Sequence, residues 1–169
     1  DYKNRVIYIK SFSKILMPGL RMGLMVLPKK VRHAVMEAKY TTDISTSGFI
    51  QKSLEEYLRV NGWEAHGKQV RQYGSGKYRK AVSMAKKYLL PKGASFALPD
   101  GGVSLWVRLP DGVEVFCNRA LEKNVLVSPG SQFFIEEGTG SHVRLSFAGL
   151  TDDKIEVGMK RMGEVLGEL

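Results

Sequence analysis

The stretch that decides the fold, residues 11–23, reads Ser-Phe-Ser-Lys-Ile-Leu-Met-Pro-Gly-Leu-Arg-Met-Gly. It joins two short apolar runs, Arg5–Lys10 and Met22–Leu27, whose aliphatic and β-branched composition is typical of strands buried on both faces of a parallel sheet. Pro18 and Gly19 mark a turn within this loop. Because ligands of open α/β sheets bind at strand ends, a polar loop that begins where a buried strand ends is a candidate binding site.

The loop offers three kinds of polar group to such a site. Ser11 and Ser13 carry hydroxyl donors, and Arg21 carries a guanidinium that binds a phosphate through two hydrogen bonds. Lys14 carries an amine that, when deprotonated, attacks an aldehyde to form a Schiff base. The same residue types are common on solvated surface loops, so composition alone leaves both interpretations open.

The order and spacing of these residues favour a binding site. Ser-Phe-Ser-Lys followed by Pro-Gly-Leu-Arg-Met-Gly closely resembles the lysine segment of the fold type I, class I/II aminotransferases, which use pyridoxal 5′-phosphate (PLP). In that family the lysine holds PLP as an internal aldimine and then moves the proton between substrate carbon and cofactor. The resemblance implies that Lys14 is this Schiff-base and acid/base residue. It also implies that Ser11, Ser13 and Arg21 bind the cofactor phosphate.

A second stretch resembles the same family. Residues 142–147, His-Val-Arg-Leu-Ser-Phe, are similar to the late strand whose arginine binds the substrate α-carboxylate, which implies that role for Arg144. A guanidinium suits a carboxylate because it donates two parallel hydrogen bonds and keeps its charge at any working pH. Gly101–Val107 and Val127–Phe134 resemble segments of the family's small domain, so the resemblance covers nearly the whole chain. We expect three aromatic residues of these segments to pack in the core: Trp106, Phe133 and Phe134.

Hydrophobic periodicity divides the chain near Trp63 into an α/β part followed by an α+β part. Residues 1–62 are predicted to be the C-terminal remnant of the PLP-binding large domain, and residues 63–169 the small C-terminal domain. Since two strands do not form a stable sheet alone, we expect the first part to need partner strands from a missing N-terminal region. Helices are predicted over residues 29–40, 47–61, 63–90, 113–122 and from 152 to the end, and strands over 95–98, 103–109, 125–128 and 142–147.

Three local signals refine the predicted helices. Gly62 is expected to end the second helix, and the run Gly74-Ser75-Gly76 to kink or fray the third. Thr151 is the expected N-cap of the last helix. The apolar residues of that helix recur at helical spacing and are predicted to be buried: Ile155, Met159, Met162, Val165, Leu166 and Leu169.

Composition narrows the remaining function classes. The chain of 169 residues has a formal net charge of +9, but its basic residues are spread out, so we expect this segment itself to bind no nucleic acid. The single cysteine, Cys117, is interpreted as a core thiol of a cytoplasmic protein. No apolar run is long enough to span a bilayer. The three histidines stand apart from acidic neighbours, which predicts no metal site and surface or structural roles for His33, His66 and His142.

Two functions follow from the resemblance. Gly101–Val107 and the run Arg-Leu-Ser-Phe-Ala at residues 144–148 are more similar to MocR/GntR-type transcriptional regulators, in which an aminotransferase-like effector-binding domain follows a winged helix-turn-helix DNA-binding domain. The alternative is a free-standing aminotransferase that moves an amino group between an amino acid and a 2-oxo acid. The resemblance implies an amino acid or 2-oxo acid as substrate or effector and a homodimer for the intact protein. Family residues before the lysine also hold PLP, so we expect activity, if any, of the intact parent, and this segment alone to be inactive with little or no PLP binding. The sequence does not indicate which amino acid is used.

Overall fold

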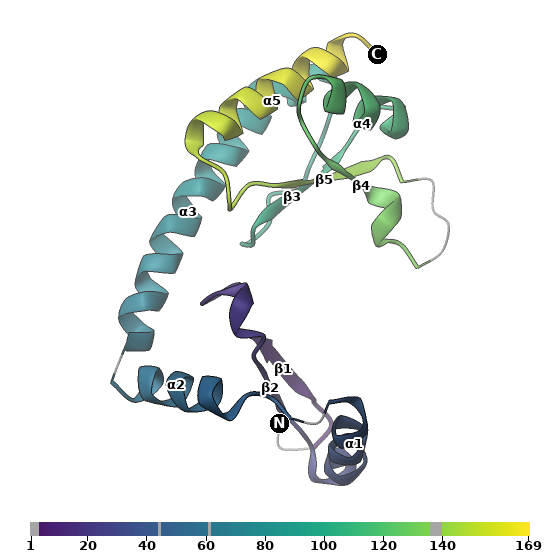
Figure 1. Cartoon of the computed structure of the whole chain (residues 1–169). Helices are drawn as coiled ribbons and strands as arrows, with labels where there is room; N and C mark the ends of the chain where they lie inside the picture. Colours follow the sequence, from purple (N-terminus) through teal and green to yellow (C-terminus); the bar gives the residue numbers. More distant parts are fainter. Residues whose placement is uncertain (1–3, 44, 61, 136–139) are drawn as a thin grey trace. The chain divides into compact units, whose positions relative to one another are not determined.

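The computed structural model describes residues 4–43, 45–60, 62–135 and 140–169. The chain divides into two compact units, residues 1–70 and 71–169, which are considered separately. One helix, α3 (Gly62–Tyr88), begins in the first unit and continues into the second (Figure 1). Trp63, where the sequence predicts the division, is the second residue of this helix. Among the described residues, no helix is both long and apolar enough to cross a membrane.

The first unit contains a two-stranded antiparallel sheet of β1 (Tyr8–Ser11) and β2 (Gly23–Val26). The pairing runs from Tyr8 opposite Val26 to Ser11 opposite Gly23. The predicted parallel arrangement is therefore wrong, because the short loop between these strands cannot make the crossover that a parallel pair requires. The single-turn 3-10 helix η1 (Pro18–Leu20) lies within this loop, where the turn residues were predicted.

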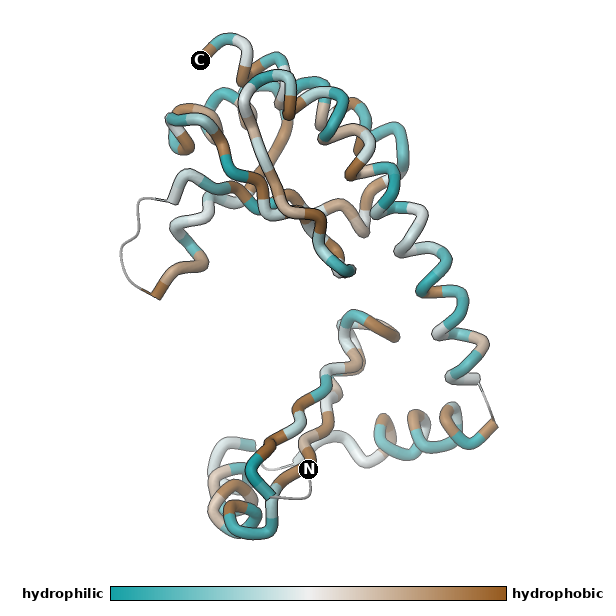
Figure 2. The backbone as a smooth tube through the Cα atoms, turned by 180° about the vertical axis from the view of Figure 1, so that it is seen from behind, coloured by the Kyte–Doolittle hydropathy of each residue, from teal (hydrophilic) through white to brown (hydrophobic). Residues whose placement is uncertain are grey.

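The strands of the first unit, which were expected to need partner strands, have exposed apolar residues in this chain. Ile9 of β1 is 68% exposed and Val26 of β2 is 58% exposed, and the other apolar residues of the pair are similarly open. Their apolar character is visible as brown segments of β1 and β2 in Figure 2. The apolar residues of β1 and β2 therefore form faces of the sheet that this chain by itself does not cover.

Two helices complete the first unit together with the start of α3. Helix α1 (Lys29–Thr42) follows Pro28, close to the predicted range. Helix α2 (Gly48–Arg59) begins after Ser47, whose hydroxyl accepts a hydrogen bond from the Ile50 amide at 3.5 Å. The predicted end of this helix at Asn61 lies outside the described residues.

Gly62 begins α3 and does not end α2, so its predicted role is wrong. A Cβ at this position would lie 2.8 Å from the ring of Tyr57, closer than side chains pack. The glycine is therefore needed for the tight approach of two helices, a requirement that a capping pattern in the sequence does not reveal.

The second unit is an antiparallel sheet covered by helices. Its strands lie in the order β3 (Ser104–Arg108), β5 (His142–Ser146), β4 (Ser128–Pro129). Helix α4 (Val113–Glu122) has the predicted bounds, and α5 (Asp152–Gly167) begins after Thr151, which caps it by accepting from the Lys154 amide at 3.4 Å. Two further 3-10 turns are η2 (Leu90–Lys92) and η3 (Gly130–Phe133).

Alternation along β3 and β5 separates a core face from an open face. Leu105 and Val107 of β3, and Val143 and Leu145 of β5, are at most 5% exposed. They join one apolar core with residues of α3, α4 and α5, including Phe116 at 1% exposure. The other face of these strands carries polar and aromatic side chains, so the second unit has a complete core on one side of its sheet and an open surface on the other.

Several predictions for the second unit are wrong. Helix α3 runs without interruption through Gly74-Ser75-Gly76, where it is held from outside: the Tyr73 hydroxyl donates to the Ala148 carbonyl, and Lys77 pairs with Asp152 at 2.6 Å. The predicted strand 95–98 is reduced to one bridge between Ser95 and Arg108, and the predicted strand 125–128 to the two residues of β4. Leu169 is 52% exposed because α5 ends at Gly167. The three aromatic residues expected in the core are 38–49% exposed: Trp106, Phe133 and Phe134.

Candidate functional site

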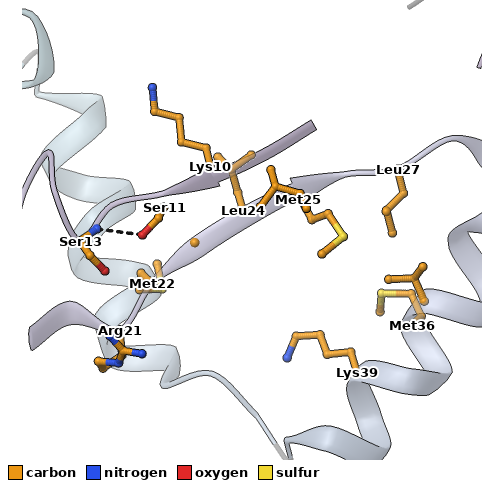
Figure 3. Close-up of a pocket in the computed structure, with 13 residues that line it drawn as sticks. Lys10, Ser11, Ser13, Arg21, Met22, Leu24, Met25, Leu27, Met36 and Lys39 are labelled. Atoms are coloured by element: carbon orange, nitrogen blue, oxygen red, sulfur yellow. Dashed lines mark hydrogen bonds between the residues drawn. The ribbon is translucent and has the colours of Figure 1, made fainter. Parts of the chain in front are cut away.

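A pocket of about 650 Å³ in the first unit is lined by β1, β2, α1 and the loop between the strands. Three of the four residues predicted to hold a cofactor line it: Ser11, Ser13 and Arg21. Figure 3 shows these three gathered at one end, with the apolar side chains of Leu27 and Met36 at the other. We call the end with Ser11, Ser13 and Arg21 the polar end; Met22 also lies at this end, and Lys39 lies on the side of Met36.

Backbone geometry fixes the polar end. The Ser13 amide donates to the Ser11 hydroxyl at 3.2 Å, which makes a tight turn, and the Phe12 amide donates to the Met22 carbonyl at 3.0 Å, which closes the loop. Arg21 adopts the left-handed conformation (φ 48°, ψ 36°), and its amide donates to the Pro18 carbonyl at 3.2 Å. A left-handed conformation costs a residue with a side chain about 1 kcal/mol. Such strain at a non-glycine residue is concentrated at functional sites in proteins.

The charge of the pocket suits an anion. Lys10, Arg21 and Lys39 line it, and none of the lining residues among those described is acidic. Lys39 also pairs with Asp43 at 2.7 Å, outside the lining. A phosphate dianion at the polar end would meet hydroxyl and guanidinium donors in a region of positive potential.

Lys14 is exposed and is not among the residues that line this pocket. The amides of Ile15 and Leu16 both donate to the Phe12 carbonyl, at 3.2 and 2.9 Å, so the backbone turns sharply at this lysine. Phe12 is 6% exposed and anchors the turn in the first unit. In the described chain Lys14 thus lies on a turn next to Ser13, and its side chain is exposed and does not line the pocket.

Two residues of α3 contact this turn, and sequence analysis did not assign them to the site. The ring of Trp63 meets that of Phe12 edge-on, with centroids 6.1 Å apart. The Nε2 atom of His66 lies 2.5 Å from the Ile15 carbonyl oxygen. Because His66 and Ile15 are 51 residues apart in the chain, no local pattern indicates this contact.

The open face of the β3–β5 sheet forms a second polar region, in the second unit. Arg144 donates through Nε to the Ser104 hydroxyl at 3.4 Å, and its guanidinium lies 5.5 Å from the centre of the Phe133 ring. A pocket of about 490 Å³ is lined by these strands and by residues 95–99, and contains both Arg144 and Arg108. Arg144 is therefore oriented by a hydroxyl and an aromatic ring, with its terminal donors available for an anion.

The aromatic residues of this face pack on one another at the surface. Trp106 stacks on His142 with centroids 5.3 Å apart and an interplanar angle of 11°, and meets Phe133 edge-on at 5.7 Å. This packing explains why these rings are not in the core, since they form a wall beside Arg144. His142 is half-buried in this stack.

Two further observations concern candidate metal ligands and the thiol of Cys117. Within residues 4–43, 45–60, 62–135 and 140–169, no group of three or more histidine, cysteine, aspartate or glutamate residues is placed to hold a metal ion. Cys117 packs against the core, and burial raises the pKa of its thiol above the ordinary value. A raised pKa keeps the sulfur protonated and unreactive at neutral pH.

Comparison with known proteins gives matches over nearly the whole chain. A sequence model of the family described as "Aminotransferase class I and II" matches residues 1–162. Aromatic-amino-acid aminotransferase 1 of Thermococcus litoralis is 30% identical over 99% of this chain and 40% of its own length. The uncharacterized HTH-type transcriptional regulator YdfD of Bacillus subtilis is 29% identical over 100% of this chain and 35% of its own length.

A solved structure extends the comparison to three dimensions. The crystal structure of Pyrococcus horikoshii kynurenine aminotransferase, solved in complex with PMP, KYN and KYA, matches with a TM-score of 0.93 and 33% identity. The match covers 99% of this chain and 42% of that one. The chain thus spans between 35% and 42% of the length of these three proteins.

Proposed function

Because the chain belongs to the class I and II aminotransferase family, we propose that it is part of a PLP-binding aminotransferase-like domain in which Lys14 holds the cofactor. The observation that carries the proposal is the convergence of Ser11, Ser13 and Arg21 on one end of a pocket, on the loop that also presents Lys14. On this proposal, residues 1–62 complete the large, cofactor-binding domain, and residues 63–169 form the small domain.

The residues of the first unit fit the phosphate group of PLP. Two hydroxyls and a guanidinium supply neutral and charged donors, and Lys10 adds positive potential. When bound, PLP supplies the electron sink that stabilises a carbanion at the amino-acid Cα. Lys14 provides the covalent attachment point for the cofactor aldehyde and moves a proton to or from that Cα through its Nζ.

The residues of the second unit fit the carboxylate of an amino acid or 2-oxo acid. Ser104 and the Phe133 ring hold the Arg144 side chain, which leaves its planar end free to donate two hydrogen bonds. The aromatic wall beside Arg144 provides an apolar surface for the substrate side chain. A homodimer in the cytoplasm, as the family resemblance and the single cysteine predict, is part of the proposal.

Covalent labelling tests the role of Lys14. The intact protein is incubated with PLP, reduced with sodium borohydride and mapped by peptide mass spectrometry. We expect the label on Lys14, its loss in Lys14→Ala, and its retention in Lys30→Ala, a change of an exposed lysine at the start of α1 that does not line the pocket. A label that stays on another lysine in Lys14→Ala would contradict the proposal.

The second candidate function is the effector-binding domain of a transcriptional regulator. It is favoured by the match to the YdfD regulator, which covers this chain as completely as the aminotransferase match does. A winged helix-turn-helix upstream of Asp1 in the gene, with DNA binding that responds to an amino acid, would support the regulator. Transfer of an amino group from an amino acid to a 2-oxo acid by the intact protein would support the free-standing enzyme.

A further inference from the structure

We propose that His66 is a positioning residue for Lys14, holding the turn that presents the amine through a hydrogen bond to the Ile15 carbonyl. The proposal rests on the proposed function, because it assumes that Lys14 is the cofactor-holding residue. It concerns a residue of α3 that lies far from the lysine in sequence and outside the motif that carries the family resemblance.

The first step is the contact between the turn and α3. Phe12 is buried to 6% exposure and meets Trp63 edge-on, at an interplanar angle of 75°. Trp63 and His66 are three residues apart on one helix, so their side chains lie on the same face. The turn is therefore held on both sides of Lys14: by Phe12 two residues before it and by Ile15 one residue after it.

The second step is the direction of the hydrogen bond. A carbonyl oxygen accepts but cannot donate, so the Nε2 atom of His66, 2.5 Å from the Ile15 oxygen, must carry the hydrogen. The neutral ring with hydrogen on Nε2 and the protonated ring both satisfy this requirement. His66 is therefore the donor in this contact.

The third step is that His66 is itself held in place. The Tyr57 ring meets the imidazole edge-on at 6.2 Å and 83°, and the Tyr57 hydroxyl donates to the Gly62 carbonyl at 3.1 Å. The missing side chain of Gly62 gives this ring its space. The end of α2 and the start of α3 thus fix the imidazole before it contacts the turn, which is how preorganised sites support a reactive group.

The fourth step is that Lys14 lacks a side-chain support of its own. Among the described residues its amine makes no hydrogen bond or ion pair, and the side chain is exposed. The location of the amine is therefore set by the backbone on either side. Removing the His66 bond would release the Ile15 side of the turn while leaving the Phe12 side intact.

The test compares two substitutions of His66 in the intact protein. His66→Gln keeps a side-chain donor for the Ile15 carbonyl, whereas His66→Phe keeps a ring against Tyr57 and loses the donor. We expect amide hydrogen exchange at Ile15 and Leu16 to become about tenfold faster in His66→Phe, the effect of losing one net hydrogen bond, and to change much less in His66→Gln. The affinity for PLP, measured by absorbance titration, should fall about tenfold in His66→Phe and recover in His66→Gln.

His33→Phe is the matched control, because His33 is exposed on α1 and its ion pair is with Glu37 of the same helix. It should leave both readouts unchanged. Unaltered exchange at Ile15 and Leu16 in His66→Phe would overturn the proposal, as would equal losses in His66→Phe and His66→Gln. Failure of the proposed function is distinguishable, since it would appear as absence of the borohydride label on Lys14 in the unsubstituted protein.

Discussion

The two units of this chain differ in how completely they bury their apolar residues. In residues 71–169, one continuous core includes Leu105, Phe116 and Val143, each at most 1% exposed. In the described part of residues 1–70, the buried side chains are those of Phe12, Pro28 and Leu54, while most apolar residues of β1 and β2 are exposed. The second unit buries its apolar residues as a self-sufficient domain does. The first unit leaves an apolar surface exposed, as expected for two strands that lack partner strands.

Because of this difference, the cofactor chemistry proposed for Lys14 lies in the unit whose apolar strands are exposed. The loop with Lys14 belongs to the unit whose strands are uncovered, whereas Arg144 belongs to the unit with a complete core. The carboxylate recognition proposed for Arg144 would therefore depend on local packing that the chain contains. The cofactor binding proposed near Lys14 would depend on strands whose apolar residues are exposed in this chain, which spans 35% to 42% of the compared proteins.

The largest expected effect contrasts two apolar truncations. Leu105→Ala empties a fully buried position and should lower the free energy of unfolding by about 2–5 kcal/mol. In this chain alone, Ile9→Ala, at a position 68% exposed, should cost less than about 1 kcal/mol. The two tryptophans, Trp63 and Trp106, give one fluorescence probe per unit in single-tryptophan variants during denaturant unfolding. Equal losses of unfolding free energy in Leu105→Ala and Ile9→Ala would contradict the difference in burial between the two units.

The next effect concerns Arg144. Arg144→Lys keeps the charge but cannot donate in a planar pair, so it should weaken binding of an amino acid or 2-oxo acid by about 30-fold, or about 2 kcal/mol. Isothermal titration of the intact protein measures this loss. PLP loading should stay unchanged, because the phosphate donors lie in the other unit. A parallel loss of PLP would show that the two functions are not divided between the units.

Two glycines in α5, Gly158 and Gly163, test how closely this helix packs in the core of the second unit. A Cβ at Gly163 would lie 2.5 Å from the Tyr88 carbonyl oxygen, so Gly163→Ala should destabilise the second unit by about 1–3 kcal/mol. A Cβ at Gly158 meets nothing within 4 Å, and Gly158→Ala should stabilise the helix by up to about 1 kcal/mol. Thermal unfolding followed through Trp106 checks both signs. Destabilisation of equal size at both sites would contradict the packing described between α3 and α5.

The smallest effect is the pH dependence of the second unit. The hydrogen bond from Lys77 holds the pKa of Asp152 below its ordinary value, and the bond from Lys80 does the same for Glu156. A carboxylate whose pKa is lowered by folding contributes its full stabilisation at pH values above its unfolded-state pKa, which is about 4. This stabilisation is lost as the pH falls through its folded-state pKa. The unfolding midpoint should thus drop modestly between pH 6 and pH 3. Lys77→Met should reduce the dependence of the unfolding midpoint on pH. An unchanged pH dependence would show that the Lys77–Asp152 ion pair does not contribute to it.

Local signals predicted the helices well. Helix α4 has the predicted bounds, and Thr151 caps α5 as expected, because capping and helical periodicity depend on residues close in sequence. The sequence led us to expect that β1 and β2 need partner strands, and their apolar residues are exposed in this chain; periodicity reports which faces are apolar and not what covers them. The continuity of α3 through its glycines depends on contacts with Ala148 and Asp152 from other elements.

The candidate site was predictable where it is a motif. Ser11, Ser13 and Arg21 were identified from order and spacing, and they lie together at one end of a pocket. His66 and Trp63 could not be identified, because they contact residues of the loop that are 51 positions away in the sequence. Contacts at that separation produce no periodic pattern in the sequence. The aromatic wall beside Arg144 was missed for a related reason: hydrophobicity alone does not separate a ring in the core from one that packs on a surface arginine.

An absorbance titration with PLP, carried out in parallel on the intact protein and on this chain alone, tests the central claim most directly. The account predicts a saturable absorbance change in the intact protein that disappears in Lys14→Ala, and little or no such change in the chain alone although its second unit is folded. Equally strong, Lys14-dependent binding by both proteins would show that the first unit forms the cofactor site without further segments. Binding that is indifferent to Lys14 in the intact protein would contradict the assignment of that lysine.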